Sequence, residues 1–212
     1  MKQLCITFIF IAVAACGQVA VRAEDQSIAD QPPSTVNKLI RVPLTRQATD
    51  YTCGAAALQS VLGYYGDEIR EGSLAKQLKS NSKIGTRYVE MERFAKQKGY
   101  AVEPKREMEL ASLQRYIDAG TPVICLIQAW AGKKVDYKTD WEDGHYVVAV
   151  GYDEKNMYFM DPSTLGNYTF IPIGEFLDRW HDRDGKTRLN HFGMTVSKGK
   201  AVFNRDEVKL MQ

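Results

Sequence analysis

The hydrophobic pattern of this chain changes character near Pro122. Before it, apolar residues recur at the spacing of helices with one buried face, as in Ala57, Val61 and Tyr65. After it, short apolar runs separated by glycine, aspartate and asparagine are typical of strands. The expected helices cover 53–65, 73–79, 86–98, 110–117 and 175–180, and the expected strands cover 123–128, 145–150, 157–160, 168–173 and 192–196. A helical first half followed by an antiparallel second half predicts an α+β domain.

The first of these helices begins with a cysteine. Cys53 is followed by the apolar stripe, Gly66 supplies the stop, and Asp50 and Thr52 supply side-chain oxygens for capping the first turn. Unpaired backbone N–H groups and the positive end of the helix dipole favour a thiolate over a thiol at this position. Cys53 is therefore the candidate nucleophile.

The sequence contains three histidines that could serve as the base for a cysteine nucleophile. His145 opens a strand, whereas His181 lies in a charged turn at 182–185 and His191 on a late strand, where surface or packing roles are expected. Asp161 ends the next strand, and a hairpin turning near 153–156 should bring positions 145 and 161 roughly opposite each other. Its carboxylate could then accept the second N–H of the His145 imidazole.

Gln47 completes the candidate site. It lies on the segment that enters the Cys53 helix, so its amide could point at the atom that the thiolate attacks. Together with the backbone N–H of Cys53, it would hold the negative charge that develops on a carbonyl oxygen. A plain loop role for Gln47, a turn-opening role for Asp161 and a packing role for Cys53 or His145 are the alternatives.

These residues resemble the motifs of the papain-like cysteine peptidases, and within them the bacteriocin-processing family that cleaves after double-glycine leaders. The resemblance covers about 39–196 and rests on Gln47 with Cys53-Gly54, Gly144-His145-Tyr-Val-Val, Asp161-Pro162 and Glu175-Phe-Leu-Asp-Arg-Trp180. It implies a nucleophile helix packed on an antiparallel sheet, with Cys53 as nucleophile, His145 as general base and acid, Asp161 as orienting carboxylate and Gln47 as oxyanion donor. Thr52 stands where these peptidases usually have an acidic residue, so the resemblance implies the reaction and leaves the substrate open.

The N-terminal residues predict export. An apolar run at 4–15 after Lys2 is typical of a secretory signal, and it is too short for a permanent membrane span. Two ends compete: a lipobox that makes Cys16 a lipid anchor, and ordinary cleavage after Ala23. We therefore expect a signal at 1–23, a flexible linker at 24–38, a peptidase domain at 39–197 and a polar tail at 198–212, in a periplasmic or lipid-anchored protein of the bacterial envelope.

The remaining cysteines bear on the redox state. Export leaves Cys53 and Cys125 in the folded part, and a disulfide between them is one outcome. The continuous apolar run at 122–127 favours a buried free Cys125 instead.

Composition restricts the partners. The formal net charge is only +2 and the basic residues are scattered, which does not suggest nucleic acid. No metal or other cofactor is expected, because the acidic turns lack the spacing of a calcium loop. A peptide or protein substrate is expected. A papain-like module that binds peptides without cleaving them, and an acyl-transfer or deamidating enzyme with the same triad, stay open.

Overall fold

The computed structural model describes residues 39–164, 166–208 and 210–211. The signal, its Cys16 and the linker lie outside these residues. The helices are α1 (Cys53–Tyr64), α2 (Glu71–Gln77), α3 (Tyr88–Gln97), α4 (Leu110–Asp118) and α5 (Ile173–Arg179). The strands are β1 (Ala101–Lys105), β2 (Val123–Gln128), β3 (Gly144–Tyr152), β4 (Asn156–Met160), β5 (Tyr168–Pro172), β6 (His181–Asp184), β7 (Thr187–Asn190) and β8 (Gly193–Ser197).

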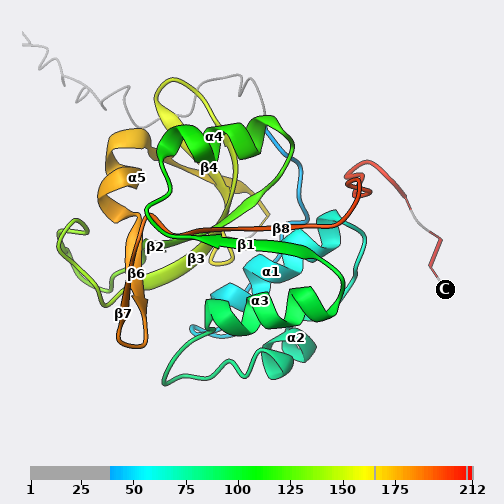
Figure 1. The fold of residues 1–212 in the computed structure, drawn as a ribbon, viewed down its shortest axis with the longest axis horizontal. Helices are drawn as coiled ribbons and strands as arrows, with labels where there is room; N and C mark the ends of the chain where they lie inside the picture. The colour runs from blue at the N-terminus through cyan, green and yellow to red at the C-terminus, as the bar shows by residue number, and fades with distance from the viewer. Residues whose placement is uncertain (1–38, 165, 209, 212) are drawn as a thin grey trace, which may run out of the picture. The chain divides into compact units, whose positions relative to one another are not determined.

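Six strands form one antiparallel sheet in the order β1-β8-β2-β3-β4-β5. Helices α1, α2 and α3 lie on one side of this sheet, and α4 lies on the other (Figure 1). Every residue of β2 and β4 is buried, and both strands lie inside the sheet with a paired strand on either side. The expected α+β fold with the Cys53 helix packed on an antiparallel sheet is confirmed.

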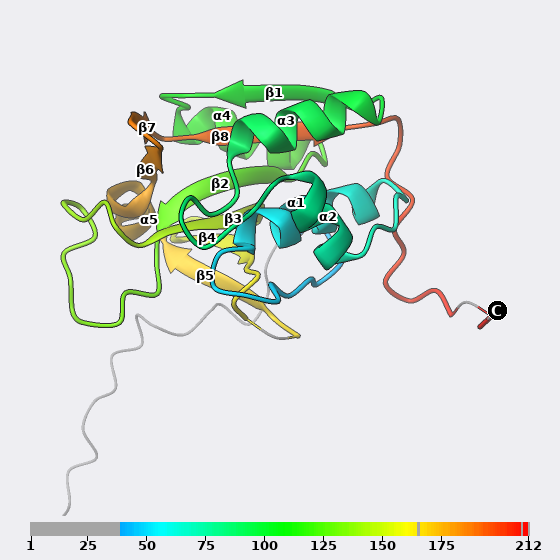
Figure 2. The same cartoon turned by 90° about the horizontal axis from the view of Figure 1, so that it is seen from below.

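The edge strand β1 corrects one detail of that expectation. It pairs with β8, and it comes from the helical first half of the chain, before α4. Figure 2 shows β1 and β8 running side by side along one edge of the fold. The strand pattern at this position covers few residues, so local sequence favours an extended segment without indicating its partner.

The charged turn expected at 182–185 is only partly confirmed. Residues 182–184 belong to β6, which pairs with β7 in a two-stranded ribbon, and the turn lies at Gly185 and Lys186. His181 opens β6 and is buried, with its Nε2 2.7 Å from the Asp140 carbonyl oxygen, and its ring lies against Trp141. Polar strands of this kind lack the apolar alternation that sequence analysis depends on.

His191 also lies elsewhere than expected. It sits between β7 and β8, with a φ of 43°, and its ring stacks on the buried Trp180. This contact supports a packing role.

The glycine after Cys53 is explained by close packing. A Cβ added at Gly54 would lie 2.8 Å from Thr86 Cβ and 3.0 Å from Tyr146 Cδ2. Tyr146 belongs to β3, the strand that carries His145. The absence of a side chain at Gly54 therefore lets the beginning of α1 approach the beginning of β3.

Cys125 is fully buried in β2, Cys53 in α1 is 7% exposed, and both cysteines are free thiols. Burial raises the pKa of the Cys125 thiol. The interpretation of Cys125 as a core residue is supported, and the structure contains no disulfide between it and Cys53.

Candidate active site

The nucleophile candidate begins α1. Cys53 is 7% exposed and helps to line a cavity. Thr52 is the N-cap, as expected, but no side chain caps the first turn. The Thr52 hydroxyl instead donates to the Thr49 carbonyl oxygen at 3.3 Å. The predicted side-chain cap is therefore wrong, because the hydroxyl is used to fold the loop that precedes the helix.

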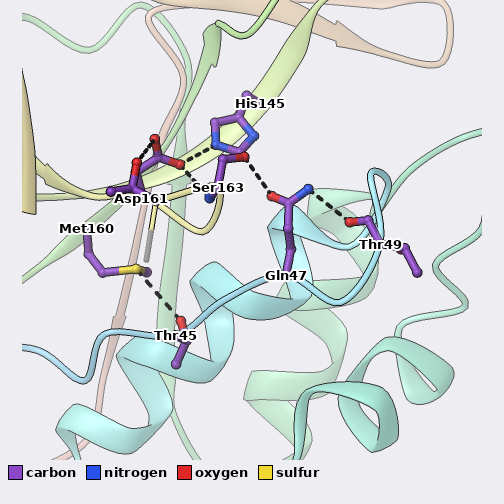
Figure 3. A network of polar contacts seen from close by, with 8 residues as sticks. Thr45, Gln47, Thr49, His145, Met160, Asp161 and Ser163 are labelled. Atoms are coloured by element: carbon purple, nitrogen blue, oxygen red, sulfur yellow. Dashed lines mark hydrogen bonds and ion pairs between the residues drawn. The ribbon is translucent and has the colours of Figure 1, made fainter. Parts of the chain in front are cut away.

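His145 and Asp161 are in direct contact. The His145 Nε2 lies 2.7 Å from Asp161 Oδ1, and both side chains are almost completely buried (Figure 3). With Nε2 engaged in this way, Nδ1 is the imidazole nitrogen left for the thiol. The pair therefore has the geometry of a base and the carboxylate that orients it.

The imidazole of His145 is tuned by three effects. Burial lowers its pKa, whereas the hydrogen bonds and charges of Asp161 and Cys53 raise it, and the pKa reaches about 9. His145 is consequently protonated at neutral pH. An imidazolium that responds to both Cys53 and Asp161 is the electrostatic arrangement that a thiolate nucleophile requires.

Asp161 is held by its own turn. Burial raises the pKa of its carboxyl, but His145 and the Ser163 N–H outweigh this and keep the pKa below its ordinary value. The Ser163 amide donates to Oδ1 at 2.8 Å and the Thr164 hydroxyl to Oδ2 at 3.3 Å. Sequence analysis missed Ser163 and Thr164. An aspartate that accepts from the backbone two residues on is a recurrent turn, so the Asp161-Pro162-Ser163 sequence carried the signal.

Gln47 connects the Asp161 turn to the loop before α1. Its backbone N–H donates to the Pro162 carbonyl oxygen at 3.1 Å, and its Oε1 accepts from the Ser163 hydroxyl at 3.2 Å. Its Nε2 donates to the Thr49 carbonyl oxygen at 2.9 Å, as Figure 3 shows. One of the two Nε2 hydrogens is therefore used within the loop, and the other stays available for an oxyanion.

Two cavities adjoin Cys53, His145 and Asp161. One of about 240 Å³ has Cys53 in its wall, together with three carboxylate side chains. The other, of about 590 Å³, has His145 and Asp161 in its wall and is otherwise lined mainly by apolar side chains, including Trp130, which is 61% exposed. The two cavities share no lining residue, so they are two distinct recesses.

The described residues contain no group of three histidine, cysteine or acidic side chains arranged to hold a metal ion. The candidate site offers a thiol, an imidazole, a carboxylate and amide groups.

Comparisons with known proteins identify the family and the fold. The sequence model of the Peptidase_C39 like family matches residues 39–187. The fold is similar to the crystal structure of a putative C39-like peptidase from Bacillus anthracis, with a TM-score of 0.60, 19% identity and coverage of 77% of this chain and 98% of the other. It is also similar to the peptidase domain of Streptococcus ComA, a bi-functional ABC transporter involved in a quorum-sensing pathway, with a TM-score of 0.56, 21% identity and coverage of 76% and 99%.

A third similar structure is a double glycine motif protease from an AMS/PCAT transporter, in complex with the leader peptide. Its TM-score is 0.53 at 21% identity, over 76% of this chain and 94% of the other. No curated protein sequence matches the chain. At these identities the solved structures establish the shared fold.

Proposed function

Since the chain belongs to the Peptidase_C39 like family and has the papain-like fold, we propose that it hydrolyses peptide bonds with Cys53 as nucleophile. His145 is the general base and acid, and Asp161 orients it. The observation that carries this proposal is the buried 2.7 Å contact of His145 with Asp161, on an imidazole whose pKa also responds to Cys53.

The reaction follows from the protonation states. The Cys53 thiolate attacks the peptide carbonyl carbon, and the oxygen takes up the negative charge. The tetrahedral intermediate collapses to a thioester as the C–N bond breaks and His145 gives its proton to the leaving amine. Neutral His145 then accepts a proton from water, whose oxygen attacks the thioester. The acid product leaves, and the thiolate and imidazolium are restored.

The oxyanion is assigned to two donors. They are the backbone N–H of Cys53, in a helix turn that no side chain caps, and the second N–H of Gln47 Nε2. Preorganised donors of this kind contribute strongly, because they stabilise charge that appears only in the transition state.

Alkylation of the thiol tests the nucleophile. The purified protein is treated with iodoacetamide at pH 6, and modification of Cys53 is followed by peptide mapping. We expect Cys53 to react much faster than a free thiol, because an imidazolium beside a cysteine favours the reactive thiolate form, and His145→Ala to remove the difference. A rate no greater than that of a free thiol would remove the peptidase proposal and leave a peptide-binding module.

A peptide-library digest then tests the reaction. Peptide cleavage, with new amino and carboxyl termini identified by mass spectrometry, supports hydrolysis. Ammonia release from glutamine-containing peptides without chain cleavage would instead indicate a deamidating enzyme, and transfer to an added amine would indicate an acyl transferase.

We also propose that the domain works outside the cytosol, at the bacterial envelope. The support is the apolar run at 4–15. It ends in Val13-Ala14-Ala15-Cys16, which would make Cys16 a lipid anchor, and a second possible cleavage site follows at Ala23. In the described part of the chain, no helix is both long and apolar enough to cross a bilayer. Labelling of cells with a radioactive fatty acid separates the two forms: incorporation that Cys16→Ser abolishes indicates a lipid anchor, and a soluble periplasmic protein without label indicates cleavage after Ala23.

A further inference from the structure

The smaller cavity beside Cys53 carries charge that the proposed reaction does not use. Its wall includes Asp50, Asp182 and Asp184, which come from the loop before α1 and from β6. Asp50 is exposed, Asp182 is half-buried and Asp184 is 7% exposed. The negative charges thus extend from the surface to the interior of the recess that contains the candidate nucleophile.

Asp182 approaches the strand that carries His145 because of a glycine. A Cβ added at Gly144 would lie 1.8 Å from Asp182 Oδ2, so any other residue at this position would require the carboxylate to move. Gln128 Nε2 donates to Asp182 Oδ1 at 2.9 Å. Burial raises the pKa of Asp182 to about 6, which leaves the carboxyl mostly ionised at neutral pH.

Only one of the two carboxylate oxygens of Asp184 has a positively charged partner. Its Oδ1 lies 2.5 Å from Arg87 Nε, whereas its Oδ2 is enclosed and has no hydrogen-bond partner among the described residues. A buried carboxylate oxygen without a donor is costly, and nearby positive charge reduces that cost. The deep end of the cavity therefore favours a cation, which would act on Asp184 through space and on Asp182 directly.

The cationic residue in the wall, Arg183, supplies part of this charge, because its positive charge lowers the pKa of Asp182. The Arg183 guanidinium also lies 3.7 Å from Glu142 Oε1 and 5.7 Å from the centre of the Trp141 ring, so it is shared with a further carboxylate. The three carboxylates thus exceed the positive charge that faces them.

The size and the remaining lining fit one extended side chain. The volume is about 240 Å³, below the roughly 300–1,000 Å³ of pockets that hold drug-sized ligands. Ile84 and Leu126 contribute apolar surface, and long basic side chains bury their methylene stems on such surface while their charged end stays with polar groups.

We propose that this cavity binds a lysine or arginine side chain of the substrate close to the scissile bond, with Asp182 as the main specificity residue. The inference rests on the proposed peptidase function for its biological meaning. It departs from a site that accepts only glycine next to the cleaved bond, because a glycine would leave the cavity and its carboxylates unoccupied.

A binding measurement tests the cavity without turnover. The full chain with Cys53→Ala is titrated with Nα-acetyl-lysine methylamide, and with the norleucine equivalent as the uncharged control, while backbone amide shifts are followed by NMR. We expect the lysine compound to shift the amides of Gly144 and Asp182 and the norleucine compound to leave them unchanged. Asp182→Asn should weaken the lysine effect at least about tenfold. Equal effects of the two compounds, or none from either, would overturn the proposal.

A cleavage measurement tests selectivity on the active chain. Matched peptides with Lys, Arg, Gln or norleucine at each position next to the observed cleavage site are compared by kcat/KM. We expect Lys or Arg to exceed Gln by at least about tenfold at one position, and Asp182→Asn to bring the ratio within about threefold. Asp178→Asn removes an exposed carboxylate of α5 and should leave the ratio unchanged.

The two measurements separate the two proposals. Cleavage without a preference for basic residues, together with no lysine-specific shifts, would refute the proposed binding of a basic side chain and leave the peptidase proposal standing. Lysine-specific shifts on a protein that cleaves no peptide would refute the peptidase proposal and leave the binding of a basic side chain standing.

Discussion

The side chains of His145 and Asp161 are in contact, although the register of the sheet does not place these two residues opposite each other. Val148 of β3 pairs with Met160 of β4, and this register, continued by one residue, puts Asp161 across from Val147 rather than across from His145. His145 lies two residues before Val147, near the start of β3, and on the same face of the strand as Val147. The contact of 2.7 Å is therefore a diagonal one, made after β4 has ended. The expectation of two roughly opposite residues was wrong in register by two positions.

The alkaline limb of the activity profile should depend on Asp161. His145, with a pKa of about 9, holds its proton below that pH and loses it above, so the leaving amine loses its proton donor. We expect kcat/KM to fall as pH rises through about 9. Asp161→Asn removes a hydrogen bond and a charge that raise this pKa, so the fall should begin at lower pH.

The same variant should also reduce kcat, by up to about 10⁴-fold. Profiles of kcat/KM from pH 5 to 10.5 on a cleaved peptide provide the measurement. Thr164→Ala, which removes only the hydroxyl on Asp161 Oδ2, is the milder control. An unchanged alkaline limb in Asp161→Asn would contradict the assignment of Asp161 as the orienting carboxylate.

Gln47 should matter more for turnover than for folding. Gln47→Ala removes the proposed oxyanion donor, and loss of one such donor typically costs about 10²- to 10³-fold in kcat. Ser163→Ala is the matched control, because it removes the hydroxyl bound to Gln47 Oε1 and keeps the Ser163 N–H that Asp161 accepts. We expect both variants to lower Tm by a few degrees and Gln47→Ala alone to lower kcat strongly. Equal kcat values in the two variants would indicate that Gln47 only connects the loops.

Gly54 should be intolerant of the smallest side chain. Alanine favours helices over glycine by about 1 kcal/mol, but its Cβ would clash with Thr86 and Tyr146. Overpacking costs about 1–3 kcal/mol, so we expect Gly54→Ala to reduce the free energy of unfolding and to lower activity by displacing Cys53. Gly72→Ala in α2 is the control, because a Cβ there meets nothing within 4 Å. Urea unfolding should show that Gly72→Ala is neutral or stabilising; the same result for Gly54→Ala would refute the packing explanation.

The two described cysteines should differ in accessibility. Cys53 lines an open cavity, whereas Cys125 is completely buried in β2 and its pKa is raised by burial. With a chromogenic disulfide reagent at pH 7, followed by peptide mapping, we expect Cys53 to react in the native protein and Cys125 only after denaturation. Recovery of a Cys53–Cys125 disulfide peptide from non-reduced native protein would contradict the free thiols of the structure.

Local pattern was sufficient for most of the elements. The apolar stripe behind Cys53 predicted α1, and the uninterrupted apolar run predicted β2, because burial of one helix face or of a whole strand leaves a periodic trace in the sequence. The ribbon of β6 and β7 has no such periodic pattern of apolar residues. Three of the four residues of β7 are exposed, and β6 consists of His181 and three charged residues.

The sequence by itself indicated which groups could do chemistry: Cys53 at the start of a helix, His145 at the start of a strand, and Asp161 at the end of the next strand. Only the tertiary structure decided what surrounds them. A β-bulge between Ala149 and Gly151 sets the register of β3 and β4, and packing at glycines brings Tyr146 to Gly54 and Asp182 to Gly144. These contacts join residues far apart in the chain, and their distances depend on strand register and side-chain volume, which local periodicity does not specify. The acidic cavity beside Cys53 is therefore a product of packing.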